Sequence, residues 1–183
     1  MLEATILFAD AGGFTRFSEG RAPEEVAQAL NALFHECNDI LLSHDAMVDK
    51  LMGDEVMAVF GAPIVRPDHA QQAVEAALAI QRRASDLFPA DWEGACLRIG
   101  IHSGTVFVGR IGSGHIKDYT AVGDVVNVAS RLQTEAQPGE VLVSDVVYRE
   151  IAEPRPKAEE RRLFLKGRAE PVTAFALGGF RPG

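Results

Sequence analysis

The chain has few of the features that mark secreted, membrane or nucleic-acid-binding proteins. It has only two cysteines, Cys37 and Cys96, both in apolar surroundings, so we expect no disulfide framework and a reducing, cytoplasmic compartment. No apolar run reaches the length of a membrane span, and the N terminus lacks the regions of a signal peptide. With a net charge of −8 and no basic patch interleaved with aromatics, nucleic acid is not an expected partner.

The length and composition are typical of one globular domain over residues 1–183. The hydrophobic content of 47% over 183 residues is enough for a sizeable core. An acidic chain that binds a polyanion such as a nucleotide needs metal ions or a few well-placed cations. The first apolar run begins almost at Met1, so we expect a catalytic or binding module with room for a sensor or regulatory domain upstream.

Apolar runs and helical periodicity predict the elements of the fold. They are a strand at 4–10, a helix at 22–43, a hairpin at 46–61 with its turn near 52–53, a helix at 68–87, a strand at 95–112 kinked near 103–104, a helix at 123–136, a strand at 140–145, a short helix at 144–152, and strands at 161–168 and 171–177. Helices alternate with strands, but one strand pair is a direct hairpin. This order predicts an α+β fold, a ferredoxin-like mixed sheet covered by helices on one face, with additions at the C-terminal end.

The first candidate site follows the first strand. Asp10 ends the strand and precedes Ala11, Gly12 and Gly13. Glycines let the backbone approach a phosphate, and the N–H groups of a following helix start point at the anion. An acid at the strand end would hold Mg²⁺ against that phosphate. The alternative is a plain strand–turn–helix junction in which Asp10 acts as a cap.

The hairpin "DKLMGDEVMAVFG" adds a second acid and a lysine. Asp54, just past the predicted turn, can meet Asp10 on a neighbouring strand. Two converging carboxylates repel each other unless cations lie between them, and two Mg²⁺ ions are the usual solution for displacement at phosphorus. Lys50, across the turn, can donate to N1 of adenine, whereas N1 of guanine carries a proton. A surface ion pair between Lys50 and Asp54 is the alternative.

Two further stretches carry polar groups suited to a nucleotide. In "YTAVGDVVNVASRL", Asn127 and Arg131 are four residues apart and share a helix face. Arginine suits charge that develops on phosphoryl oxygens, and asparagine can fix a sugar oxygen. In "LFLKGR", Lys166 lies between a strand and a glycine, where it can reach a phosphate. Each of these residues alone is equally compatible with a solvated surface.

Taken together, these stretches resemble the catalytic domain of class III nucleotidyl cyclases, the adenylate and guanylate cyclases. The matching motifs are "LFADAGGFT", "DKLMGDEVMAVFG", "RIGIHSG", "YTAVGDVVNVASRL" and "LKGR", in the family's order over about residues 4–177. The resemblance implies the class III architecture and a homodimer with each site at the interface. The implied reaction is attack of the ribose 3′-oxygen of ATP on the α-phosphorus, which gives 3′,5′-cyclic AMP and pyrophosphate.

The resemblance also implies the roles of individual residues. Asp10 and Asp54, with the carbonyl of Ala11, would hold two Mg²⁺ (or Mn²⁺) ions. The triphosphate would be bound by Lys166 and by the backbone N–H groups of Gly12, Gly13, Phe14 and Thr15.

The remaining roles concern the base and the reacting phosphate. Lys50 and Thr120 match the two base-reading positions. Asn127 matches the residue that orients the ribose, and Arg131 the one that stabilises the transition state at the α-phosphate. Because each site takes metal residues from one chain and base residues from the other, Lys50 and Asp54 should serve opposite sites.

Two positions depart from the common pattern of the family. Many members have aspartate at the second base-reading position. This chain has Thr120 there, and in this it resembles a subgroup of bacterial adenylate cyclases in which bicarbonate stimulation is known. A hydroxyl can accept from adenine N6 or donate to guanine O6, so we expect weaker discrimination than with aspartate. Ile116 lies where related bacterial motifs often have a triphosphate-binding arginine, for which His115 or Lys117 would have to substitute.

Four alternatives stay open on the sequence alone. A diguanylate cyclase is one, because "MGDEV" is similar to the GGDEF motif, and a guanylate cyclase is another. The missing arginine at Ile116 favours a nucleotide-binding regulatory module without catalysis. An RNA-binding ferredoxin-like domain is disfavoured by the negative charge. His102, inside an apolar strand, is expected to be a core histidine without a catalytic role.

Overall fold

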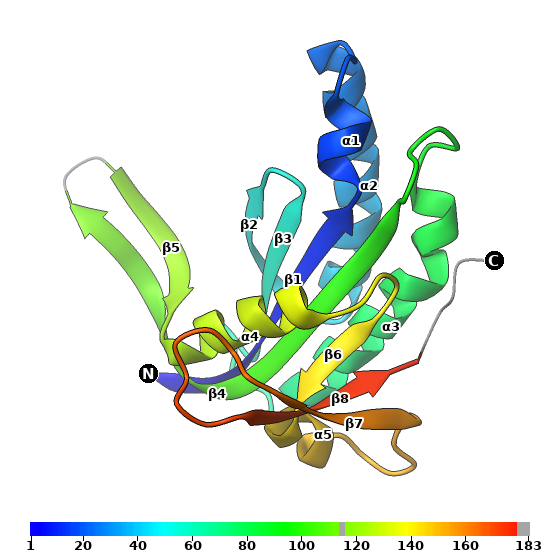
Figure 1. Ribbon diagram of the computed structural model, residues 1–183. Helices are drawn as coiled ribbons and strands as arrows, with labels where there is room; N and C mark the ends of the chain where they lie inside the picture. The colour runs from blue at the N-terminus through cyan, green and yellow to red at the C-terminus, as the bar shows by residue number, and fades with distance from the viewer. Residues whose placement is uncertain (114–115, 179–183) are drawn as a thin grey trace.

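The computed structural model describes residues 1–113 and 116–178, which form one mixed sheet with helices packed against it (Figure 1). The elements in chain order are β1 (Leu2–Gly12), α1 (Phe14–Ser18), α2 (Pro23–Ser43), β2 (Met47–Met52), β3 (Glu55–Phe60), α3 (His69–Leu87), β4 (Cys96–Ser113), β5 (Ile116–Val122), α4 (Asp124–Glu135), β6 (Val141–Ser144), α5 (Asp145–Glu150), β7 (Ala158–Leu163) and β8 (Val172–Leu177). No helix within this described part combines the length and apolar character needed to cross a bilayer.

The sheet has the order β2-β3-β1-β4-β6-β8-β7, with β5 paired to β4 outside this path. The central strand β1 is antiparallel to both β3 and β4, and β4 is parallel to β6. This confirms the predicted α+β mixed sheet. It also places the end of β1 beside the β2–β3 hairpin, where the candidate acids lie.

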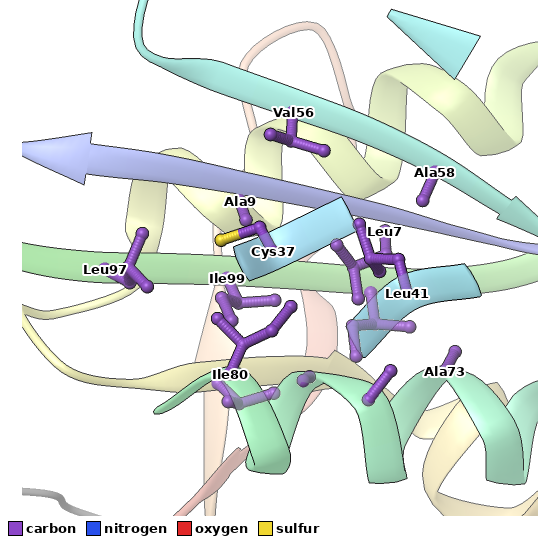
Figure 2. Packing of buried hydrophobic residues seen from close by; sticks show 14 of the residues in the cluster. Leu7, Ala9, Cys37, Leu41, Val56, Ala58, Ala73, Ile80, Leu97 and Ile99 are labelled. Carbon is purple, nitrogen blue, oxygen red and sulfur yellow. The ribbon is translucent and has the colours of Figure 1, made fainter. Parts of the chain in front are cut away.

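Helices cover both faces of the sheet, so the prediction of one covered face is wrong. Leu7 and Ala9 of β1 belong to the cluster formed with α2 and α3, and Figure 2 shows residues of this cluster. Ile6 and Phe8, which alternate with them, pack on the other face with Val125 of α4. Because β1 is apolar on both faces, each face needs a helix to exclude water.

The backbone of α4 lies directly on β4 at Gly100. A Cβ on Gly100 would lie 2.5 Å from the carbonyl oxygen of Ala129 and would also overlap the backbone nitrogen of Gln133. Glycine is therefore required there by close approach rather than by its dihedral angles. This contact fixes the height of α4 above the sheet, and with it the positions of Asn127 and Arg131.

Four features differ from the sequence prediction. The strand β5 was not predicted; it pairs with β4 from Phe107 onward, so that β4 and β5 project together as an arm (Figure 1). The predicted strand at 161–168 instead starts at Ala158 and ends at Leu163. Its first residues are polar and resemble a loop in the sequence, which explains the difference. The short helix α1 was also missed. Pairing of β4 with β1 extends to Val106, beyond the expected kink at 103–104.

Candidate functional site

Two carboxyl groups meet at the end of β1, as the sequence predicts. Asp54 lies within the β2–β3 turn itself, and its carbonyl oxygen accepts a hydrogen bond from the N–H of Ala11 at 3.0 Å. This bond ties the turn to β1 and brings the Asp54 carboxyl against that of Asp10. Burial, followed by the charge of Asp10, raises the pKa of Asp54.

Arg98 balances part of this negative charge, and the sequence analysis missed it. Its Nη2 donates to Oδ2 of Asp10 at 2.5 Å, from the position on β4 that pairs with Asp10. Glu55 pairs with Asp10 from the other side, and burial, then the charges of Asp10 and Asp54, raise its pKa. One guanidinium therefore faces three carboxyl groups.

The carboxylates here suit an open site, in which water and substrate phosphates complete the shell of a divalent cation. They do not suit a site in which protein side chains supply all the ligands. Within the described residues no group of three or more His, Cys, Asp or Glu side chains is arranged to hold a metal. Asp10 and Asp54 offer two carboxylates, and Mg²⁺ is usually held by one or two carboxylates with water and substrate phosphates. A cation between them would relieve the repulsion that raises the pKa of Asp54.

Close contacts hold the glycine turn after Asp10. Gly13 has φ of 77° and forms the N-cap of α1, and a Cβ there would lie 2.8 Å from the carbonyl oxygen of Glu93. The indole Nε1 of Trp92 donates to the carbonyl of Gly12 at 3.1 Å. No side chain caps α1, so the reading of Asp10 as a simple cap is wrong. The first N–H groups of α1, those of Phe14 and Thr15 among them, have no partner within the helix.

The two base-reading candidates, Lys50 and Thr120, meet at a third residue that the sequence analysis missed. The hydroxyl of Thr120 donates to Oδ2 of Asp49 at 2.6 Å, and the N–H of Ala121 donates to the same oxygen at 3.3 Å. The other carboxylate oxygen, Oδ1, lies 3.8 Å from Nζ of Lys50, and the Asp49 side chain is only 1% exposed. Pairing of β2 with β3 shifts by one residue between Val48 and Lys50, which takes Asp49 out of the ladder.

The polar face of α4 and the loop after β7 form a third group. Asn127 is exposed and Arg131 is half-buried on α4, and Lys166 is exposed in the loop. Arg168 forms an ion pair with Asp124 at the start of α4, which fastens this loop to the helix.

The loop also contacts Arg131 directly. A Cβ on Gly167 would lie 3.5 Å from Nη2 of Arg131. With the other described residues, the side chains of Asn127, Arg131 and Lys166 form neither ion pairs nor hydrogen bonds. Three polar groups from two elements are therefore available to a ligand.

Within one chain the acid pair and the α4 group remain separate. No hydrogen bond or ion pair among the described residues joins Asp10 or Asp54 to Asn127 or Arg131. The structure thus brings together each half of the predicted site, but not the two halves.

Two sequence-level expectations concern residues beside these groups. The question of which residue replaces arginine at position 116 stays open, because His115 and the side chains of Ile116 and Lys117 lie outside the described residues. The Nδ1 atom of His102 lies 2.7 Å from Oγ of Ser144. Burial, followed by the charge of Arg168, lowers the pKa of His102 to about 4.

Comparisons with known proteins agree on one family. A model described as the adenylate and guanylate cyclase catalytic domain matches residues 1–178. Adenylate cyclase 1 of Rhizobium meliloti is 39% identical over 135 residues, which are 72% of this chain but 20% of that protein. The chain therefore spans about a fifth of the length of this curated relative.

Solved structures of both substrate types are similar to the chain. The adenylyl cyclase CyaB from P. aeruginosa superposes with a TM-score of 0.89 and 30% identity, over 98% of this chain and 95% of that one. The guanylate cyclase domain of RhGC from Catenaria anguillulae, solved in complex with GTP, also gives a TM-score of 0.89, with 29% identity over 96% of each chain.

Proposed function

The chain belongs to the family of adenylate and guanylate cyclase catalytic domains, and we propose that it is an adenylate cyclase that converts ATP to 3′,5′-cyclic AMP and pyrophosphate. Relatives of both substrate types are similar to it, so the choice of ATP rests on the site. The observation that carries it is the meeting of Lys50 and Thr120 at Asp49. An ammonium group at this place can donate to N1 of adenine, whereas it faces an N–H on guanine.

The acid pair is the proposed metal site. Asp10 and Asp54 would hold two divalent cations, Mg²⁺ or Mn²⁺, with help from the carbonyl of Ala11. When bound there, the metal ions would lower the pKa of the ribose 3′-hydroxyl and neutralise charge on the phosphates. The raised pKa of Asp54 beside Asp10 supports this assignment.

The other groups would bind and orient the nucleotide. The backbone N–H groups from Gly12 to Thr15 and the ammonium of Lys166 would hold the triphosphate. Asn127 would orient the ribose, and Arg131 would stabilise the charge that develops on the α-phosphate oxygens. The lack of partners for Asn127, Arg131 and Lys166 among the described residues supports these roles, because a pre-formed ion pair would have to be broken first.

The active form would be a homodimer, in which Asp10 and Asp54 of one chain face Lys50, Thr120, Asn127 and Arg131 of the other. The separation of the two halves within one chain supports a shared site. The β4–β5 arm also exposes large apolar side chains, which favours a protein partner. These are Phe107, Ile111, Tyr119 and Val122, each more than 40% exposed.

Product identification tests the proposal. The protein is incubated with ATP or GTP and Mg²⁺ or Mn²⁺, and the products are identified by mass spectrometry, with Asp10→Asn as a control for contaminating enzymes. Cyclic AMP from ATP is expected. Preferential formation of cyclic GMP or cyclic di-GMP from GTP would indicate one of the other cyclases, and ATP binding without pyrophosphate release would indicate a regulatory module.

A further inference from the structure

Asp49 is the least exposed charged group near the proposed base site, and it contacts both base-reading residues. We propose that Asp49 determines base selectivity by fixing the direction of the Thr120 hydroxyl, so that the hydroxyl oxygen can only accept a hydrogen bond from the base. Asp49 acts through Thr120 and is therefore a positioning residue. This inference rests on the proposed function, since it assumes that Lys50 and Thr120 face the base.

The direction of the Thr120 hydroxyl follows from the chemistry of its partner. An ionised carboxylate has no proton to give, and a hydroxyl has one. At 2.6 Å from Oδ2 of Asp49, the Thr120 hydroxyl must be the donor. The other acceptor in reach, the carbonyl of Ala121, lies at 3.5 Å, which is too long to compete. Only the lone pairs of Oγ1 remain for a ligand.

The same carboxylate also contacts the second base-reading residue. Oδ1 of Asp49 lies 3.8 Å from Nζ of Lys50, so that the ammonium group and the Thr120 hydroxyl lie on either side of one carboxylate. The N–H of Ala121 holds Oδ2 in place. The protein therefore presents a donor, Lys50, beside a fixed acceptor, Thr120.

This donor–acceptor pair matches one purine and mismatches the other. The Watson–Crick edge of adenine has an acceptor at N1 beside a donor at N6, which is the complement of Lys50 and Thr120. Guanine has a donor at N1 beside an acceptor at O6, so that it would face both residues with like groups. Without Asp49, the Thr120 hydroxyl could turn and donate to O6, and the second mismatch would disappear.

The test is the substitution Asp49→Leu, which is similar in shape, with kcat/KM measured for ATP and for GTP. Leucine has no acceptor for the Thr120 hydroxyl, whereas the amide oxygen of asparagine would still accept from Thr120 and from the N–H of Ala121. We therefore expect the ATP-to-GTP ratio to fall by about fivefold or more. An unchanged ratio would overturn the role of Asp49.

A double-mutant cycle shows whether Asp49 acts through Thr120. In a Thr120→Val background, Asp49→Leu should change the ratio by less than about twofold, because the hydroxyl is already gone. An equal change in both backgrounds would mean that Asp49 acts by another route, for example through Lys50, and would overturn the proposal.

Thr120→Ser is the conservative control, because it keeps the hydroxyl and its bond to Asp49. It should keep the ATP-to-GTP ratio, whereas Thr120→Val should lower it. Equal ratios for the serine and valine variants would refute the proposal even if Asp49→Leu could not be purified.

The activity of the wild-type protein distinguishes failure of the Asp49 proposal from failure of the proposed function. A wild type that cyclises neither nucleotide, or that prefers GTP, overturns both. A wild type that makes cyclic AMP from ATP, combined with an Asp49→Leu variant of unchanged ratio, overturns only the assignment of Asp49.

Discussion

The carboxyl group of Asp54 lies against that of Asp10, but Arg98 forms its ion pair with Asp10, at 2.5 Å. Burial and the charge of Asp10 raise the pKa of Asp54, and the charge of Arg98 offsets this only in part. Asp54→Asn should therefore leave the unfolding free energy unchanged or raise it, because it removes a repelled charge. Asp10→Asn should lower it by about 1–2 kcal/mol, because Arg98 loses its ionic partner. Urea denaturation measures both.

Both substitutions should reduce formation of the cyclic nucleotide by about two orders of magnitude or more, because each removes a carboxylate of the proposed metal site. Near-normal Mg²⁺-dependent turnover in either variant would show that the acid pair does not bind the metal.

A shared site predicts complementation between two inactive variants. Asp54→Ala and Arg131→Ala alter different halves of the site, so each should be inactive alone. Random mixing gives one intact site in each heterodimer, and the expected recovery is about a quarter of wild-type activity. Differently tagged chains would show that heterodimers have formed. Heterodimers without activity would count against a site built from two chains.

Lys50→Glu should change the preferred base. A carboxylate accepts from N1 and N2 of guanine but cannot donate to N1 of adenine. A mismatch of this kind costs about 1–3 kcal/mol, so the GTP-to-ATP ratio of kcat/KM should rise by roughly 5- to 150-fold. Lys50→Ala, which only removes the donor, should lower ATP selectivity without gaining GTP turnover. Unchanged selectivity in both variants would remove Lys50 from the base site.

The contact between α4 and β4 predicts different costs for two substitutions of glycine by alanine. Gly100→Ala places a methyl group against the backbone of Ala129 and Gln133 and should destabilise the fold by about 2–4 kcal/mol. Gly104→Ala on the same strand meets only a methyl of Val125, at 2.9 Å, and should cost about 1 kcal/mol or less because that side chain can move. Thermal unfolding compares them; equal losses would mean that α4 does not rest on Gly100.

His102 predicts a pH dependence of stability. Burial lowers its pKa from 6.5 to about 4 in the folded chain, so between these values the unfolded chain binds more protons. The unfolding free energy should be unaffected by His102 above pH 6.5 and fall by about 2–3 kcal/mol by pH 4.5.

Urea denaturation at pH 7.5 and 4.5 isolates this effect in variants. His102→Gln should lose less stability than the wild type over this interval. His35→Gln, at a side chain that is 75% exposed, should lose as much as the wild type. Equal losses in all three proteins would mean that His102 is protonated freely in the folded state.

Local pattern predicts some parts of this molecule and not others. The buried positions of α2 and α3 follow from their 3.6-residue periodicity, and the turn of the hairpin from Gly53. Periodicity shows which side of a helix is apolar, but not which face of the sheet it covers, and so the placement of α4 was missed. The strand β5 exists through its pairing with β4, since its own residues mix charged and apolar types without a clear period.

The same limit applies to the candidate site. Asp10 and Asp54 could be paired in advance because Asp10 follows an apolar run and Asp54 follows the glycine of a recognisable hairpin turn. Asp49 and Arg98 could not, because each acquires its importance from a partner 71 or 88 residues away. A charged residue in an apolar strand is the signal that both share, but it does not identify the partner.

The one-residue shift at Asp49 makes the length of β2 matter for the proposed base site. Val48 and Lys50 lie opposite Ala58 and Met57, which are consecutive residues of β3. A chain that lacked residue 49 would therefore form an uninterrupted ladder with the same facing residues and without the buried carboxylate. Under the proposed role of Asp49, loss of this single codon would relax the discrimination between purines. Substrate preference could then change by a deletion, without a compensating substitution elsewhere.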